Sequence, residues 1–274
     1  MVIPIGDINP TRRRPHVNWA LLAINLGVFV WQHLLLDPCE GHGFLYRFAM
    51  VPQEVLALEA LPVSTVSETL GSCAVAGADK WVLVTLVTSM FLHADIWHLL
   101  GNLLFLFVFG DNVEDRLGRV RYVLFYLAGG VIAALAYALV RPGSTIPLIG
   151  ASGAVAAVLG AYLVMHPRAK VLTYVPFPLY LLAWLIPGVR IRVWLVIFAI
   201  VKVPAWLLLG GWLAYQFIAV QDPGGANVAY EAHIAGFVAG ILAILVLDVG
   251  RSRRGKPTLH PVRHRRRPSR GRGG

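Results

Sequence analysis

The sequence predicts an all-α, polytopic membrane protein built as a six-transmembrane-helix bundle. Hydrophobic residues make up 57% of the 274 residues and charged residues only 14%, with a mean hydropathy of +0.68. Soluble globular domains are far less apolar than this. Apolar runs of about 20 residues also recur along the chain, which is the length that crosses the hydrocarbon core of a bilayer. Together these observations exclude a water-soluble domain.

Each predicted span is an apolar segment that is long enough to cross the bilayer as a helix. The first follows a polar opening stretch and has no small-residue cleavage site of the signal-peptide type, so we expect it to be retained. The six segments cover residues 17–36, 96–112, 122–140, 146–165, 203–220 and 228–247.

The distribution of positive charge predicts the orientation. With a cytoplasmic N-terminus, 21 of the 24 Lys and Arg residues fall on the inner side, and only Arg47, Lys80 and Arg141 fall outside. Positively charged loops stay in the cytoplasm, so we expect a multi-pass protein of the cell membrane with both termini cytoplasmic. The net charge of +10 is then explained by topology. We therefore expect the lipid bilayer, and no nucleic acid, as a partner.

The domain organisation follows from the same pattern. Residues 1–16 form a cytoplasmic segment, residues 17–250 the membrane domain, and residues 251–274 a basic tail. The tail is rich in Arg, Pro and Gly, so it cannot bury a core and is expected to be disordered. Within the membrane domain, residues 171–202 are an insertion broken by prolines. They form either an interfacial hairpin or an extra pair of short spans.

The first outside loop, residues 37–95, is expected to be structured and embedded in the membrane. Its stretch 81–94 is mostly apolar but too short to span, so it should lie in or dip into the outer interface. Both cysteines, Cys39 and Cys73, lie in this loop. An oxidising compartment permits a bridge between them, and two free thiols are the alternative.

Polar residues inside apolar segments are costly and often functional, and four of those in the predicted spans are candidate site residues. They are His98, Asn102, Ser152 and His233. In the predicted topology all four lie near the outer ends of the second, fourth and sixth spans. Ser152 and His233 each lie about five residues into their spans, so they share a depth of roughly 6–9 Å below the boundary.

Equal depth allows a hydrogen bond through which a neutral imidazole takes the serine proton and creates a nucleophile. His98 and Asn102 share a helix face at i and i+4, and both can donate to a developing oxyanion. Gly150 lets the backbone beside Ser152 approach a substrate carbonyl. The structural alternative is that these polar groups bond to their own backbone or hold helices together.

Three motifs carry a family resemblance. They are HADIWHLLGN at 93–102, GASGAVAAVLGAY at 150–162 and AHIAGFVAG at 232–240. In this order, over residues 17–250, they resemble the rhomboid family of intramembrane serine proteases, bacterial type. The resemblance implies a dyad of a Ser152 nucleophile and a His233 base without an acidic third member. It also implies an oxyanion site made by His98, Asn102 and the Ser152 amide, shaped by Gly150.

Other positions differ from the family or have a structural explanation. Some relatives place a tyrosine one turn after the nucleophile, where this chain has Ala156. Glu231, two residues before His233, points away from the imidazole at this spacing and is not expected to act as a triad acid. Glu114 and Arg116 match an acidic and basic pair of the family, which we interpret as structural.

The expected activity is hydrolysis of peptide bonds in or near transmembrane segments of membrane-protein substrates, close to the outer face. We expect no metal and no cofactor, because the chain has no H-E-x-x-H motif and no pair of aspartates within its spans. The alternative is a non-catalytic rhomboid-like protein that binds transmembrane helices. The sequence does not predict the oligomeric state.

Overall fold

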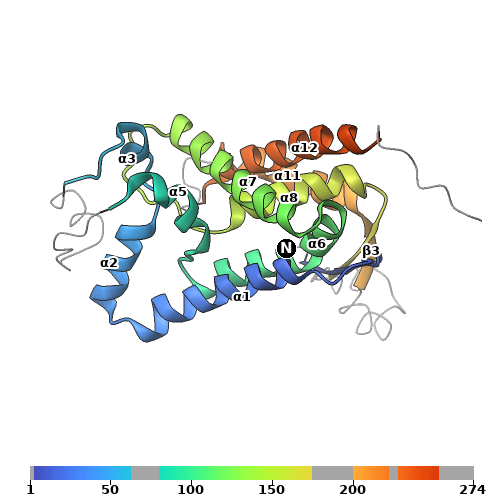
Figure 1. Ribbon diagram of the computed structural model, residues 1–274, viewed down its shortest axis with the longest axis horizontal. Coiled ribbons are helices and arrows are strands. Elements are labelled where there is room, and N and C mark those ends of the chain that lie inside the picture. Colours follow the sequence, from blue (N-terminus) through green and yellow to red (C-terminus); the bar gives the residue numbers. More distant parts are fainter. Residues whose placement is uncertain (1–2, 63–79, 175–199, 222–227, 253–274) are drawn as a thin grey trace, which may run out of the picture.

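The fold is an elongated helical bundle with short helices at one end and a small sheet at the other (Figure 1). A computed structural model describes residues 3–62, 80–174, 200–221 and 228–252. Most of the long helices run roughly along the same axis, as expected of a bundle that crosses a membrane.

A helix coincides with each of the six predicted spans. Four of these helices are long and apolar enough to cross a membrane, and two, with 14 and 15 residues, are shorter. The helices are α1 (His16–Val30, continued by a π-helical turn η1, Trp31–Leu35), α6 (Ile96–Leu117), α7 (Arg119–Val140), α8 (Ser152–Met165), α11 (Ala205–Ala219) and α12 (Tyr230–Ser252).

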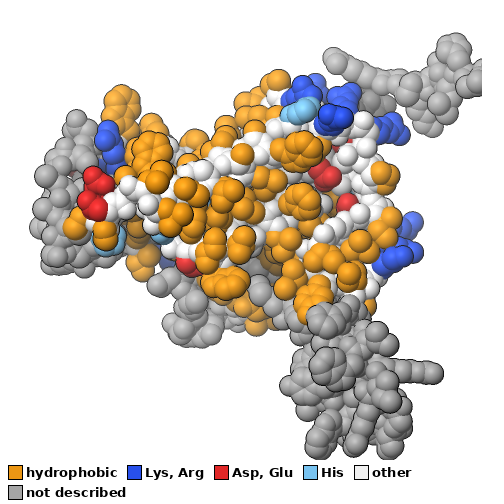
Figure 2. Space-filling view, turned by 90° about the horizontal axis from the view of Figure 1, so that it is seen from below, with side chains coloured by type: hydrophobic (Ala, Val, Ile, Leu, Met, Phe, Trp, Pro, Cys, Tyr) orange, Lys and Arg blue, Asp and Glu red, His pale blue; other side chains and the backbone are white. Residues whose placement is uncertain are grey.

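The outward faces of these helices are apolar, as a lipid environment requires. Large hydrophobic side chains such as Leu124, Leu139 and Val246 are more than half exposed. In the space-filling view, hydrophobic side chains cover the middle of the visible face, and most Lys and Arg side chains gather toward the end that carries the sheet (Figure 2). An apolar surface of this extent indicates contact with lipid. The protein is therefore a helical membrane bundle.

Helix α8 lies at the centre of the bundle and is buried from Ala154 to Tyr162. It packs most extensively against α12, where glycines bring the two backbones together. A Cβ on Gly240 would collide with the carbonyl group of Ala157, and one on Gly236 with that of Gly153. These small residues therefore allow a close contact between α8 and α12.

The start of α8 differs from the prediction. The apolar segment 146–165 was expected to be helical throughout, with Ser152 about five residues inside it, and this was wrong. Residues 146–151 are not helical, and Ser152 is the first residue of α8. Gly150 has φ +114°, a backbone conformation outside the helical range, so α8 cannot extend back through this residue. Hydropathy continues through this turn, so composition alone could not locate the boundary.

A three-stranded antiparallel sheet was not predicted. It joins β1 (Ile3–Asp7), β2 (Lys170–Tyr174) and β3 (Ile200–Pro204) in the order β1-β2-β3. Two of its strands are the ends of the predicted insertion, whose middle, residues 175–199, lies outside the described residues. Five-residue strands give little periodic signal. The pairing of β1 with β2 joins residues more than 160 positions apart, which local sequence does not indicate.

The outside loop is structured in the part that the structure describes. It forms α2 (Pro38–Phe48), α3 (Pro52–Ala57), η2 (Val82–Val84), α5 (Thr85–Thr88) and η3 (Ser89–Phe91), which gather at one end of the bundle (Figure 1). Its apolar stretch packs on α7, where Val82 and Leu86 lie in one hydrophobic cluster with Ala134 and Ala138. Cys39 is disulfide-bonded, and the other cysteine, Cys73, lies outside the described residues.

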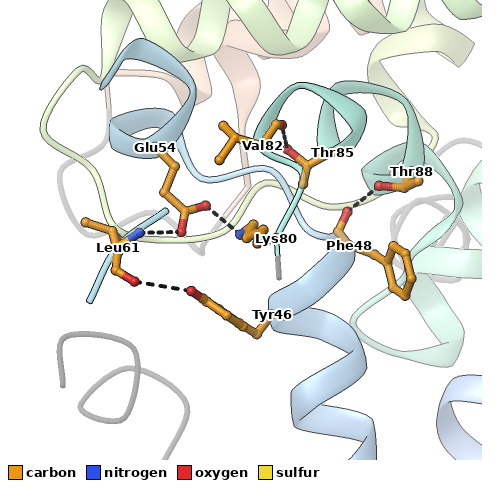
Figure 3. A network of polar contacts seen from close by, with 8 residues as sticks. All are labelled: Tyr46, Phe48, Glu54, Leu61, Lys80, Val82, Thr85 and Thr88. Carbon is orange, nitrogen blue, oxygen red and sulfur yellow. Dashed lines mark hydrogen bonds and ion pairs between the residues drawn. The ribbon is translucent and has the colours of Figure 1, made fainter. Parts of the chain in front are cut away.

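A buried ion pair holds this loop together (Figure 3). Lys80 Nζ lies 2.5 Å from Glu54 Oε2, and both side chains are completely buried. The second carboxylate oxygen of Glu54 accepts a hydrogen bond from the Leu61 amide at 3.0 Å. Burial lowers the pKa of Lys80, and the Glu54 carboxylate opposes this effect. Such a pair fixes the geometry of the loop because neither charge can be left alone without a large penalty.

Glu114 has the structural role that the sequence predicted. Its carboxylate accepts hydrogen bonds from the amides of Val17 and Asn18 at 3.2 and 2.7 Å. These amides are in the first turn of α1, which has no side-chain cap of its own. A negative charge at a helix N-terminus also suits the helix dipole. Glu114 therefore joins the end of α6 to the start of α1.

Candidate active site

Ser152 lies at the N-terminus of α8, directly after the Gly150 turn. The Gly150 amide donates to the carbonyl of Ser89 at 2.9 Å, which ties the turn to the outside loop. The residue before the helix, Ala151, provides no side-chain cap. The first amides of α8 therefore have no acceptor within the helix and can bind a negatively charged oxygen.

His233 lies in the first turn of α12 and contacts Ser152. Its Nε2 is 2.8 Å from Ser152 Oγ. The close packing of α8 and α12 produces this contact, because both residues lie at the same end of adjacent helices. Both side chains are partly exposed. A hydroxyl in this position can donate to the imidazole and then lose its proton to it.

Two aromatic rings and an amide surround the imidazole of His233. The ring of Trp212 lies 5.9 Å away at 32°, and that of Tyr230 6.3 Å away at 88°. Its Nδ1 lies 2.8 Å from Oε1 of Gln216. Aromatic residues of α11 and α12 therefore pack beside the imidazole.

Sequence reasoning missed Gln216 and Trp212. Gln216 is a polar residue within the apolar segment 203–220. The criterion that selected His98, Asn102, Ser152 and His233 therefore applies to it equally, and could have found it. Trp212 carried no comparable signal, because tryptophan is common in apolar segments.

His98 and Asn102 converge on Gly150. Asp95 begins α6, and its carboxylate accepts from the amides of Trp97 and His98, which lowers the pKa of Asp95. A Cβ on Gly150 would lie only 2.6 Å from Cε1 and Nε2 of the His98 ring, and 3.7 Å from Nδ2 of Asn102. Two nitrogen-bearing side chains thus lie against the turn that precedes Ser152.

His93 supports Asn102 from within the protein. It is completely buried, and its Nε2 lies 3.1 Å from Nδ2 of Asn102. Its backbone carbonyl accepts from Nε2 of His33 at 2.9 Å, and its ring packs against that of His98 at 5.1 Å. An amide nitrogen carries two hydrogens, so the bond to His93 orients Asn102 and leaves one hydrogen for another acceptor.

Glu231 is directed away from the imidazole, as its spacing indicated. Its Oε1 pairs with Arg141, at 3.0 Å from Nε and 2.6 Å from Nη2. This pair joins α12 to the end of α7. Within the described parts of the chain, no group of three or more His, Cys, Asp or Glu side chains is arranged to hold a metal ion.

The hydroxyl and imidazole meet across two helices, with imidazole and amide groups against the adjoining turn, in the arrangement of a serine hydrolase site inside a helical membrane bundle. The chain belongs to the rhomboid family, because a rhomboid domain model matches residues 80–248. Members of this family are generally intramembrane serine proteases, and some members are inactive. Membership therefore supports intramembrane protease activity in general.

Individual relatives support the same assignment. The chain is 29% identical over 187 residues to RHOMBOID-like protein 12, mitochondrial, of Arabidopsis thaliana, covering 62% of this chain and 48% of that protein. It is 27% identical over 234 residues to Rhomboid protein 1, mitochondrial, of Saccharomyces cerevisiae, with coverages of 82% and 51%. It is 46% identical over 146 residues to Rhomboid-like protein 11, chloroplastic, of Arabidopsis thaliana, with coverages of 53% and 40%. The chain thus spans about half the length of the first two relatives.

Proposed function

We propose that the protein is an intramembrane serine endopeptidase that hydrolyses peptide bonds in or near transmembrane segments of membrane-protein substrates. The observation that carries this proposal is the 2.8 Å contact between Ser152 Oγ and His233 Nε2, made between two helices of a membrane bundle. Family membership supports the same class of reaction.

In the proposed mechanism, Ser152 Oγ attacks the substrate carbonyl carbon while His233 Nε2 takes the hydroxyl proton. The tetrahedral intermediate collapses when the imidazolium gives this proton to the leaving amine, which breaks the peptide bond and leaves an ester on Ser152. A water molecule, deprotonated by the same imidazole, then hydrolyses the ester. The second product is a free carboxyl terminus, and the dyad is restored.

The negative charge of the intermediate needs donors close to Ser152. We assign this role to the Ser152 amide together with the side chains of His98 and Asn102, with Gly150 holding the turn open between them. Support comes from the uncapped start of α8 and from the approach of both side chains to Gly150. Donors placed before the reaction lower its barrier because they need no reorganisation.

The substrate has to expose a peptide bond that a helix normally shields by its own hydrogen bonds. We therefore expect cleavage where Gly, Ala or Pro residues weaken the substrate helix. We also propose that the site faces the outer side of the cell membrane, with both termini cytoplasmic. The gathering of Lys and Arg side chains at the opposite, sheet-bearing end of the bundle supports this orientation (Figure 2).

A co-expression assay tests the function. The substrate is a single-pass protein with Gly and Ala near the outer end of its helix and a reporter domain outside. We expect wild type to release the reporter to the outer side, and Ser152→Ala or His233→Ala to reduce release by about 100-fold or more. Ser144→Ala is the matched control, because Ser144 lies in the loop before α8 and its hydroxyl accepts from the nearby Ile146 amide.

Each outcome of this assay has a clear meaning. Undiminished release by Ser152→Ala or His233→Ala would remove the dyad. Release on the cytoplasmic side alone would reverse the proposed orientation. Capture of the substrate by wild type without any cleavage would favour the alternative, a non-catalytic rhomboid-like protein that binds transmembrane helices.

A further inference from the structure

Gln216 is a buried polar side chain that the proposed mechanism does not use. Its exposed fraction is only 3%, although its helix, α11, is otherwise strongly apolar. Burying an amide in such surroundings is costly unless its polar atoms find partners. Both ends of this amide do so: Oε1 lies 2.8 Å from His233 Nδ1, and Nε2 donates to the Trp212 carbonyl at 3.4 Å.

We propose that Gln216 is a positioning residue that fixes the tautomer and the orientation of His233. This inference rests on the proposed function, because it assigns to Gln216 the task of presenting the general base to Ser152. It gives the dyad a neutral third member in place of an acidic one.

The hydrogen bond to the Trp212 carbonyl sets the direction of the Gln216 amide. A carbonyl oxygen can only accept hydrogen bonds, so the group facing the Trp212 carbonyl has to be the NH₂ group. The amide oxygen therefore faces His233. Since an amide oxygen is also only an acceptor, Nδ1 of His233 has to carry a proton and donate it across the 2.8 Å contact.

The tautomer follows for the neutral imidazole. With the proton on Nδ1, Nε2 carries the lone pair, and this lone pair faces the Ser152 hydroxyl at 2.8 Å. The opposite tautomer would set a lone pair against the Gln216 oxygen and an N–H against Ser152, which cannot then lose its proton to the ring. Gln216 thus favours the form of His233 that acts as a base.

The same contact matters when the proton is transferred. The imidazolium that forms has a positively charged N–H at Nδ1, and hydrogen bonds to charged donors are stronger than those between neutral groups. Glu231 is engaged by Arg141, and in the described residues no carboxylate is hydrogen-bonded to His233. Gln216 therefore contacts the imidazole through a hydrogen bond, and the ring of Trp212, one turn earlier on α11, packs beside it.

The experiment compares Gln216→Met, Gln216→Glu and Gln221→Met in full-length protein. Methionine keeps the length of the side chain but lacks the acceptor, whereas glutamate keeps an acceptor at the same position. Gln221 is the matched control, because its Nε2 makes the same kind of bond, to the Phe217 carbonyl at 3.2 Å, at an exposed position. The readouts are kcat and KM for the cleaved substrate and the ¹⁵N spectrum of the histidine side chains, with His233 assigned by its absence in His233→Asn.

We expect Gln216→Met to lower kcat by about 10- to 100-fold with little change in KM. Gln216→Glu should recover most of this loss, and Gln221→Met should match wild type. In the ¹⁵N spectrum, wild-type His233 should be protonated at Nδ1, and Gln216→Met should lose this preference. Wild-type kcat in Gln216→Met would overturn the proposal.

Wild-type His233 protonated at Nε2 would also overturn it, and this measurement does not depend on whether any Gln216 variant folds. The two proposals fail separately. If wild type cleaves nothing, the proposed protease function fails, while the ¹⁵N spectrum of wild type still decides whether Gln216 sets the tautomer.

Discussion

At the scale of single residues, the site depends on polar groups in membrane helices, where apolar groups would be more stable. The sequence identified Ser152, His233, His98 and Asn102 by this property, and the structure brings the first two into contact and sets the other two against Gly150. The sequence alone could not show which of these polar groups are in contact. The contact of Gln216 with His233 joins residues of two helices, and a single sequence contains no signal for such a pair.

Gly150→Ala tests how the turn shapes the site. Alanine is strained at φ +114°, and its Cβ would displace the His98 ring. We expect turnover to fall by about 10-fold or more, because a donor to the oxyanion is moved. The measurement is kcat for the substrate with the variant in proteoliposomes. Gly143→Ala is the control, since a Cβ there meets nothing within 4 Å, and wild-type turnover in Gly150→Ala would contradict this account.

At the scale of helices, the ends of α8, α12 and α6 position the chemistry. Ser152 begins α8, His233 lies in the first turn of α12, and Asp95 caps the helix that carries His98. The sequence predicted these helices because lipid-facing and buried positions are both apolar. For the same reason it placed the start of α8 too early, since residues 146–149 are as apolar as the helix that follows.

Gly240→Ala tests the packing that brings α8 and α12 together. The added Cβ would collide with the backbone of Ala157, so the helices have to separate. We expect a loss of about 1–3 kcal/mol in the free energy of unfolding, together with reduced cleavage. Reversible unfolding followed by tryptophan fluorescence measures the first quantity. Gly210→Ala, where a Cβ meets nothing within 4 Å, is the control. Equal stability and activity of the two variants would show that close packing is not needed.

At the scale of the whole molecule, the two ends of the bundle differ in character. One end carries the outside loop with its buried ion pair, and the other carries the sheet, toward which most of the coloured Lys and Arg side chains gather (Figures 1 and 2). The turn before Ser152 is bonded to the outside loop through the Gly150 amide and the Ser89 carbonyl. Hydropathy was sufficient to predict the helical bundle, whereas the orientation predicted from charge stays a prediction. The sheet could not be predicted from hydropathy and charge, because β1 pairs with β2 through residues that are distant in the sequence.

The most direct test of the account is the reaction of Ser152 with a fluorophosphonate in purified, membrane-reconstituted protein. This reagent modifies a serine that a neighbouring base has activated, and it requires no knowledge of the substrate. We expect modification at Ser152 in wild type, identified by mass spectrometry of the labelled peptide, at a rate about 100-fold or more above that of His233→Ala. Absence of label on Ser152, or equal labelling of wild type and His233→Ala, would contradict an activated serine and histidine pair.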